Sequence, residues 1–241
     1  MEYTINIKGH LMDLSTPQVM GILNVTPDSF YSGSRKQTEM EIAQRANQII
    51  EEGGSIIDVG AFSTRPGADE VSEEEEGRRL KFALDIVRRE QPDAAVSVDT
   101  YRPTLARKCI EEWGADIIND VSEGGITGIV NVPLEQRQEE YPEMFRVVGE
   151  LKVPYILMSV QPTLETMMKG FAKEVQQLRD LGAKDIILDP GFCFGKNLIQ
   201  NYQIYNEMEK LNVMELPVLV GISRKSMIYK LLGGDATTSL N

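Results

Sequence analysis

Short apolar runs alternate along the chain with longer, charged stretches of helical periodicity. The apolar runs, each taken with the polar residues that follow it, span 20–30, 55–67, 94–100, 115–122, 154–159, 184–192 and 216–226. The amphipathic stretches span 37–52, 73–90, 103–113, 136–151, 163–181 and 199–212, and another begins at about residue 225. One run and one stretch recur roughly every 30 residues, which predicts repeated right-handed βαβ units and a parallel sheet.

Polar residues follow the apolar runs all along the chain rather than at one crossover point. This pattern favours an α/β fold of the (β/α)8 TIM barrel type, with its active site at the carboxyl ends of the strands, over a doubly wound open sheet. We therefore expect a single domain over 1–241, with an N-terminal hairpin at 1–17 and barrel units one to seven at 18–241. By this count, the eighth β/α unit is expected to be absent from this chain.

Composition narrows the function classes. The chain of 241 residues has 25 Lys and Arg against 37 Asp and Glu, and its net charge of −12 argues against nucleic acid or an anionic membrane as partner. No apolar run is long enough to span a bilayer, and two cysteines without metal-ligand spacing fit a reducing cytoplasm. The one histidine, His10, lies in the N-terminal stretch, which excludes histidine-based catalysis and histidine-rich zinc sites. The acidic run 73–76 is expected to be a solvated first helical turn.

Four polar residues stand at the ends of expected strands or just beyond them: Asp99, Asn119, Asp189 and Lys225. Carboxylate and amide groups at such positions can match the donor–acceptor edge of a heterocycle. Arg65 in the loop Ser63–Gly67 offers a planar fork for phosphate. The segment Ser223–Ser226 opens a helix, whose free N–H groups favour an anion. Together these features predict a pocket for a phosphorylated heterocycle.

Six motifs occur in order over nearly the whole chain: Gly21–Phe30, Ser63–Gly67, Ser97–Thr100, Ile118–Asp120, Asp189–Phe192 and Ser223–Ser226. In these motifs the chain resembles the dihydropteroate synthase family. The resemblance implies a transferase of folate biosynthesis, a (β/α)8 barrel that is usually a homodimer. It implies that 6-hydroxymethyl-7,8-dihydropterin diphosphate is joined to 4-aminobenzoate and that pyrophosphate is released, with Mg2+ as cofactor.

The resemblance also implies a role for each matched residue. The pterin ring would be held by Asp99, Asn119, Met158, Asp189 and Lys225, and the diphosphate by Asp28, Thr64 and Arg65. The aminobenzoate would lie among Phe30, Pro66, Phe194 and Ser226, and Mg2+ would be bound by Asn24. The catalytic groups would be Arg65, Asp99, Asp189 and Lys225. An arylamine is neutral at pH 7, so such a site needs no strong base.

Two other functions fit parts of the pattern. A barrel like the methyltetrahydrofolate corrinoid methyltransferases would share the pterin pocket but would not need the loops Ser63–Gly67 and Ser223–Ser226. A non-catalytic, truncated pterin-binding barrel would fit the absence of an eighth unit and of the family's Arg-x-His motif. Cys193 also departs from the family pattern, which often has glycine at that point of the loop beside the aminobenzoate slot.

Overall fold

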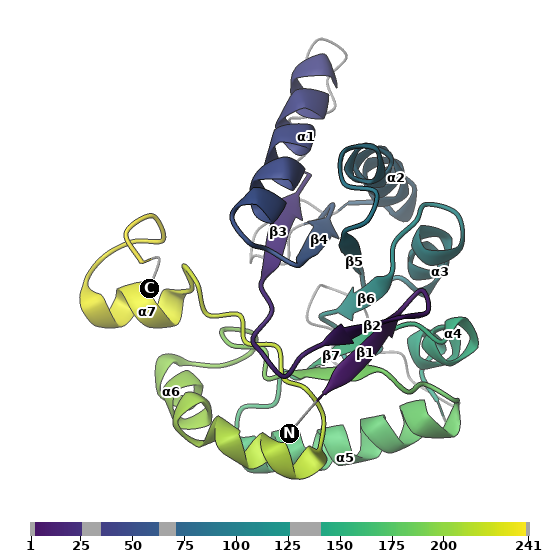
Figure 1. The fold of residues 1–241 in the computed structure, drawn as a ribbon. Coiled ribbons are helices and arrows are strands. Elements are labelled where there is room, and N and C mark those ends of the chain that lie inside the picture. Colours follow the sequence, from purple (N-terminus) through teal and green to yellow (C-terminus); the bar gives the residue numbers. More distant parts are fainter. Residues whose placement is uncertain (1–2, 26–34, 63–70, 126–140, 240–241) are drawn as a thin grey trace.

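A parallel six-stranded sheet forms the centre of the computed structural model, which describes residues 3–25, 35–62, 71–125 and 141–239. The strands are β3 (Met20–Asn24), β4 (Ile56–Gly60), β5 (Ala95–Asp99), β6 (Ile117–Asp120), β7 (Tyr155–Met158) and β8 (Ile186–Asp189). Each strand pairs with the next one along the chain, and the helices lie outside the sheet (Figure 1). Pairing in chain order is the arrangement of a sheet that curls into a barrel.

The helices match the predicted amphipathic stretches, except that the stretch predicted over 136–151 is helical only from Glu143 among the described residues, because Pro142 caps that helix. They are α1 (Arg35–Glu51), α2 (Glu73–Glu90), α3 (Pro103–Glu111), α4 (Glu143–Leu151), α5 (Leu164–Asp180), α6 (Leu198–Glu207) with the 3-10 helix η2 (Met208–Met214), and α7 (Ser226–Leu232). Strand residues that face outward are fully buried: Val59 belongs to one apolar cluster with Leu84 of α2, and Leu157 to another with Phe171 of α5. No helix in the described ranges is both long and apolar enough to cross a membrane.

A two-stranded hairpin closes the amino ends of the strands. It consists of β1 (Thr4–Ile7) and β2 (His10–Asp13), which pair antiparallel. Ile5 of β1 is buried in a cluster with one residue from each of five barrel strands, namely Ile56, Ala95, Ile117, Ile156 and Ile187. The Lys8 Nζ–Asp116 Oδ1 ion pair (2.6 Å) ties the hairpin to the barrel. Because this end is filled with apolar side chains, polar groups for chemistry must lie at the opposite end.

The segment 216–222 departs from the predicted pattern. It forms one isolated parallel bridge, between Leu188 and Val218, with backbone hydrogen bonds from Leu188 N to Pro217 O (2.9 Å) and from Leu219 N to Leu188 O (2.8 Å). The prediction of a full seventh strand is therefore wrong for the described residues. Pro217 has no N–H to donate, and in the described part of the chain only β8 pairs with this segment. Beyond it the chain reaches α7, which lies next to α6 (Figure 1), where Tyr202 OH donates to Met227 O at 2.9 Å.

Candidate active site

Three predicted site residues lie in register at the carboxyl ends of neighbouring strands. Asn24 of β3 pairs with Gly60 of β4, Gly60 pairs with Asp99 of β5, and Asp99 pairs with Asn119 of β6. A Cβ added at Gly60 would lie 3.0 Å from Asn24 Oδ1 and 3.5 Å from Asp99 Oδ2. The absence of a side chain at Gly60 therefore lets the Asn24 amide and the Asp99 carboxyl group approach each other across β4.

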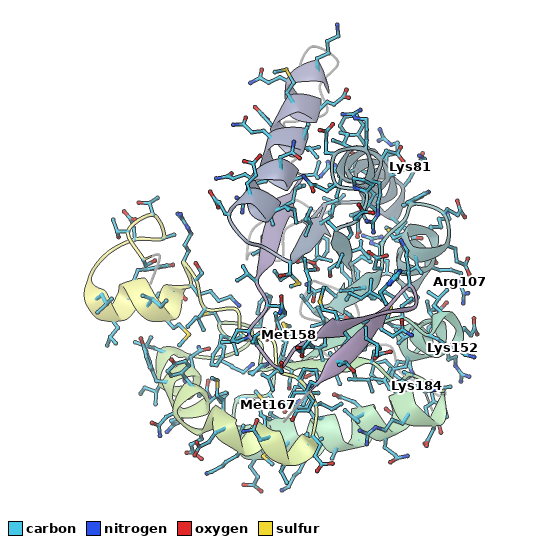
Figure 2. All side chains as sticks on the ribbon, in the orientation of Figure 1. Lys81, Arg107, Lys152, Met158, Met167 and Lys184 are labelled. Atoms are coloured by element: carbon cyan, nitrogen blue, oxygen red, sulfur yellow. The ribbon has the colours of Figure 1, made fainter. Side chains whose placement is uncertain are left out.

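The other half of the inner surface comes from β7, β8 and the segment before α7. Met158 is fully buried and is the register partner of Asp189, and it lies near the centre of the molecule (Figure 2). Lys225 Nζ donates to Phe192 O at 2.7 Å, and it lies 4.8 Å from the centroid of the Phe194 ring. The charge of Lys225 also acts on the Asp189 carboxyl. The structure thus brings Asp189, Lys225 and Phe194 together.

Burial controls the protonation of the carboxyl groups at this surface. It raises the pKa of Asp99 well above its ordinary value, and the negative charges of Asp58, Glu76 and Asp120 raise that pKa further. Burial also raises the pKa of Asp189, although the Lys225 charge and the N–H of Gly191 oppose that rise. A positively charged ligand, or one with N–H donors, would stabilise the ionised carboxylates and so lower the pKa of both Asp99 and Asp189.

Asp58 of β4 and Asn119 of β6 form a buried polar pair that spans β5, the strand of Asp99. Asn119 Nδ2 donates to Asp58 Oδ2 at 3.2 Å, and the two residues are 7% and 5% exposed. Within the described residues, Asp58 Oδ1, Asn119 Oδ1 and Asp99 Oδ1 are buried without a hydrogen-bond partner. Asp58 was not predicted as a site residue. Its position two residues before Gly60 on the same strand was the signal, since residues i and i+2 of a strand share a face.

Lys196 is a second residue near the site that the sequence did not predict. Its Nζ donates to Ser159 O (2.8 Å), Gly191 O (3.0 Å) and Phe194 O (3.1 Å), so it joins the loop after β7 to the loop after β8. Burial lowers the pKa of Lys196 to about 8, against the opposing charges of Asp189 and other groups. The Phe194 loop is therefore held by a half-buried lysine.

Ser226 begins α7, as predicted, and its hydroxyl contacts the loop that carries Phe194. Ser226 Oγ donates to Cys193 Sγ at 3.6 Å. Cys193 has a φ of +68°, in the left-handed region where glycine is the least strained residue. This backbone geometry gives a physical reason for a glycine preference at position 193.

The acidic run 73–76 is not a wholly solvated turn. Glu73 is exposed, but Glu76 is fully buried, accepts a hydrogen bond from Thr100 Oγ1 (2.7 Å) and forms an ion pair with Arg102 Nε (2.8 Å). The prediction that this run only solvates the helix start is therefore wrong for Glu76. Arg102 also donates to Val71 O at 2.6 Å, so this pair holds the chain just before α2.

Several predicted site residues lie outside the described residues: Asp28, Phe30, Thr64, Arg65 and Pro66. Their roles stay predictions.

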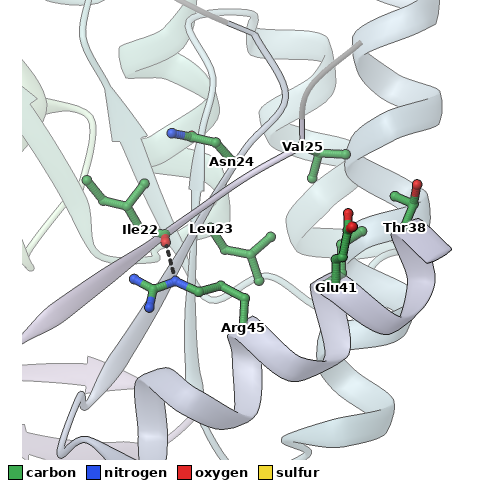
Figure 3. Close-up of a pocket in the computed structure, with 8 residues that line it drawn as sticks. Ile22, Leu23, Asn24, Val25, Thr38, Glu41 and Arg45 are labelled. Atoms are coloured by element: carbon green, nitrogen blue, oxygen red, sulfur yellow. Dashed lines mark hydrogen bonds between the residues drawn. The ribbon is translucent and has the colours of Figure 1, made fainter. Parts of the chain in front are cut away.

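Within the described ranges, no group of three or more His, Cys, Asp or Glu side chains could hold a metal ion. Asn24 is exposed at the end of β3, where it also lines a cavity of about 380 Å3 between β3 and α1 (Figure 3). In that cavity Arg45 Nε donates to Ile22 O at 3.2 Å.

Comparisons with known proteins show the family of this chain. The family described as "Pterin binding enzyme" matches residues 20–239. The dihydropteroate synthase of Escherichia coli K12 is 38% identical over 240 residues, covering 93% of this chain and 79% of that protein. The enzyme of Streptococcus pyogenes serotype M3 is 36% identical over 225 residues, covering 90% of this chain and 79% of that protein.

Solved structures of dihydropteroate synthases are similar as well. The Xanthomonas albilineans enzyme with 4-aminobenzoic acid has a TM-score of 0.82 and 31% identity, covering 97% of this chain and 82% of that one. The Vibrio fischeri enzyme has a TM-score of 0.79 and 33% identity, covering 99% of this chain and 84% of that one.

Fold and site together define a pterin-binding enzyme built on an α/β barrel, which confirms the predicted fold class. More particularly, the chain belongs to the dihydropteroate synthase family. Its activity is that of a transferase that makes dihydropteroate, as predicted from the six motifs.

Proposed function

We propose that the inner surface formed by Asp99, Asn119 and Asp189 binds the ring of 6-hydroxymethyl-7,8-dihydropterin diphosphate. The observation that carries this proposal is the set of buried acceptors: Asp99 Oδ1 and Asn119 Oδ1 have no hydrogen-bond partner among the described residues. Leaving a buried polar atom unpaired costs about 1–3 kcal/mol, so such atoms point to a ligand that supplies the donors. A pterin presents N–H and NH2 donors along one edge.

Asp189 and Lys225 complete the ring pocket in this proposal, with Met158 packing beside them. The Lys225 ammonium is directed at Phe192 O and lies over the Phe194 ring. Its remaining N–H donors are suited to an oxygen or nitrogen acceptor of the ring, while the Asp189 carboxylate is suited to its donors. Asp189 and Lys225 can therefore bind both the hydrogen-bond donors and the acceptors of one heterocycle.

We further propose that Asn24 binds Mg2+ together with the diphosphate. Asn24 fits this role because its amide oxygen is at the exposed end of β3, beside Asp99, and because Mg2+ takes few protein ligands when phosphate oxygens supply the others. When bound, Mg2+ would neutralise charge on the diphosphate. Asp28, Thr64 and Arg65 are proposed to contact the same diphosphate on the strength of their sequence motifs.

The second substrate, 4-aminobenzoate, is proposed to lie beside Phe194 and Ser226, and Phe30 and Pro66 are proposed to contact it on the strength of their sequence motifs alone. The contact between Ser226 and Cys193 supports this placement, since it brings the start of α7 to the Phe194 loop. An aromatic acid in such a slot would stack on the ring, and the serine hydroxyl could donate to its carboxylate.

The chain's own residues then act mainly by position and charge. As the C–O bond to the diphosphate breaks, positive charge develops on the ring methylene and spreads into the dihydropterin, where the carboxyl groups of Asp99 and Asp189 stabilise it. Arg65 is proposed to stabilise the departing diphosphate. The amine of 4-aminobenzoate attacks the methylene carbon and then loses a proton, so the site must exclude water until that attack.

The test is product formation by this chain. Dihydropterin diphosphate, 4-aminobenzoate and Mg2+ are incubated with the wild type, with Asp99→Asn and with Asp85→Asn, an exposed control on α2 that pairs with Lys81. We expect dihydropteroate by mass spectrometry from the wild type and the control, and a loss of at least tenfold in rate for Asp99→Asn. Pterin binding without product would favour a non-catalytic pterin-binding barrel and overturn the proposal. Equal rates for all three proteins would overturn the role of Asp99.

We also propose that the enzyme is a cytoplasmic homodimer. Both cysteines are free, which suits a reducing compartment, and the dimer rests on the family resemblance alone. Light scattering should give a mass of about 54 kDa, twice the 27.0 kDa of one chain. A mass of one chain at micromolar concentration would contradict the dimer.

A further inference from the structure

Asp58 is a buried carboxyl group of the inner surface that the proposed mechanism does not use. It lies two residues before Gly60 on β4 and is the register partner of Ser97 on β5. Its Oδ2 accepts the hydrogen bond from Asn119 Nδ2 of β6, so the contact passes over the intervening strand. Asp58 is 5% exposed, so water contributes few hydrogen bonds to its carboxyl oxygens.

This contact decides which face of the Asn119 amide is left for a ligand. A primary amide has a donor NH2 group and an acceptor oxygen, and the two exchange places when the amide turns by 180°. With the NH2 group donating to Asp58, the oxygen points elsewhere, and it is buried without a partner among the described residues. Burial raises the pKa of Asp58, and the hydrogen bond from Asn119 favours the ionised form. With Asp58 ionised, the opposite orientation would place the amide oxygen against a carboxylate, where both groups are acceptors.

We propose that Asp58 is a positioning residue that holds the Asn119 amide with its oxygen facing the bound ring, so that position 119 accepts a hydrogen bond from a ring N–H. The inference rests on the proposed function, because the pterin is the ligand that supplies this donor. It requires no contact between Asp58 and the ligand. It also adds a specificity rule: a heterocycle with a lone pair instead of an N–H at this point should be rejected.

The reciprocal exchange of the two side chains tests the orientation directly. Asp58→Asn removes the carboxylate that holds the amide while keeping nearly the same volume. In the double variant Asp58→Asn/Asn119→Asp, the amide at position 58 can donate to one oxygen of the carboxylate at position 119, and the other oxygen can accept from the ligand. Asp185→Asn makes the same chemical change at the floor of the barrel, where Asp185 Oδ1 accepts from Asn6 N, and serves as the control.

The probe is dihydropterin diphosphate with Mg2+, without 4-aminobenzoate, and the readout is calorimetric affinity. Thermal unfolding shows whether each variant folds. We expect Asp58→Asn to bind about tenfold more weakly than the wild type, the double variant to regain most of that loss, and the control to be unchanged. In steady-state assays the KM for the pterin should rise while the KM for 4-aminobenzoate stays constant.

Each contrary result has a separate meaning. Equal affinity of the wild type and Asp58→Asn would overturn the positioning role. A folded double variant that binds no better than Asp58→Asn would overturn the orientation argument, because it restores the donor and the acceptor without effect. If Asp58→Asn does not fold, the double variant alone decides, by its affinity compared with that of the wild type. Absence of pterin binding by the wild type would overturn the proposed function, and the inference with it.

Discussion

Glu174 of α5 is a buried carboxyl group whose protonation should set the pH dependence of stability. Glu174 is 7% exposed, and its Oε2 has no hydrogen-bond partner in the described ranges. The pKa of Glu174 is raised to about 8, mainly by burial and also by the nearby charges of Glu123 and Asp120, against the charge of Lys173. The folded protein therefore holds this carboxyl group protonated at neutral pH.

The direction and size of the effect follow from the two pKa values. Because the folded pKa of about 8 lies above the ordinary 4.5, the stabilisation is fully present below pH 4.5 and is lost as the pH rises through 8. The difference, 8 minus 4.5, corresponds to about 5 kcal/mol in full at 1.36 kcal/mol per pH unit, of which about 3 kcal/mol is lost between pH 5 and pH 8. This loss is a substantial fraction of the roughly 5–15 kcal/mol by which a typical domain is stable.

The substitution Glu174→Gln replaces the carboxyl group with a neutral group of the same shape. Urea unfolding at pH 5 and at pH 8 should give similar stabilities for variant and wild type at pH 5, and a variant more stable by about 3 kcal/mol at pH 8. Glu165→Gln is the matched control on the same helix, because Glu165 is exposed and forms a surface ion pair with Lys169 (2.6 Å). The control should change stability by less than about 0.5 kcal/mol at either pH.

A free-energy difference between Glu174→Gln and the wild type that is the same at pH 5 and pH 8 would refute the reasoning. The group would then ionise in the folded protein as it does in the unfolded chain. A variant that is less stable at pH 8 would mean that the carboxylate has a stabilising partner.

Three further predictions concern the loops and the sheet. Lys196→Met removes three hydrogen bonds to loop carbonyls and should raise the KM for 4-aminobenzoate about tenfold, with the KM for the pterin unchanged; equal changes in both would contradict a local role. Gly191→Ala places a Cβ 2.3 Å from a backbone oxygen at φ +62° and should cost more than about 2 kcal/mol by urea unfolding, whereas Gly9→Ala, at φ +88° with nothing within 4 Å, should cost about 1 kcal/mol. Equal costs would show that crowding is unimportant. Tyr155→Phe removes the hydrogen bond to Asp120 Oδ2 (2.7 Å) and should cost about 1–2 kcal/mol; a neutral effect would mean that the remaining donors suffice.

Residues at strand ends could be predicted from the sequence because their placement is local. Asp99, Asn119 and Asp189 each close an apolar run, and parallel strands of similar length bring such ends together without further information. The pattern also predicted the helices, since their apolar faces recur with helical spacing.

Residues whose surroundings come from distant parts of the chain could not be found in this way. Lys196 lies in a loop of no regular pattern, and its three acceptors belong to two different loops. Glu76 resembles its acidic neighbours in sequence, but only the packing of α2 against the end of β5 separates it from solvent. The segment 216–222 reads as a strand from its composition, whereas its pairing depends on neighbours and on Pro217.

The edge of β3 has a consequence for the behaviour of the protein in concentrated solution. Among the described strands only β4 pairs with β3, and Ile22 is 58% exposed on that strand. Unpaired backbone groups beside an exposed apolar side chain are a template to which a strand of another molecule can add. Arg45 occupies one of the acceptors, the Ile22 carbonyl, and leaves a guanidinium charge at the edge. We therefore expect this edge to favour association at high protein concentration, and Arg45 on α1 to oppose it by its charge.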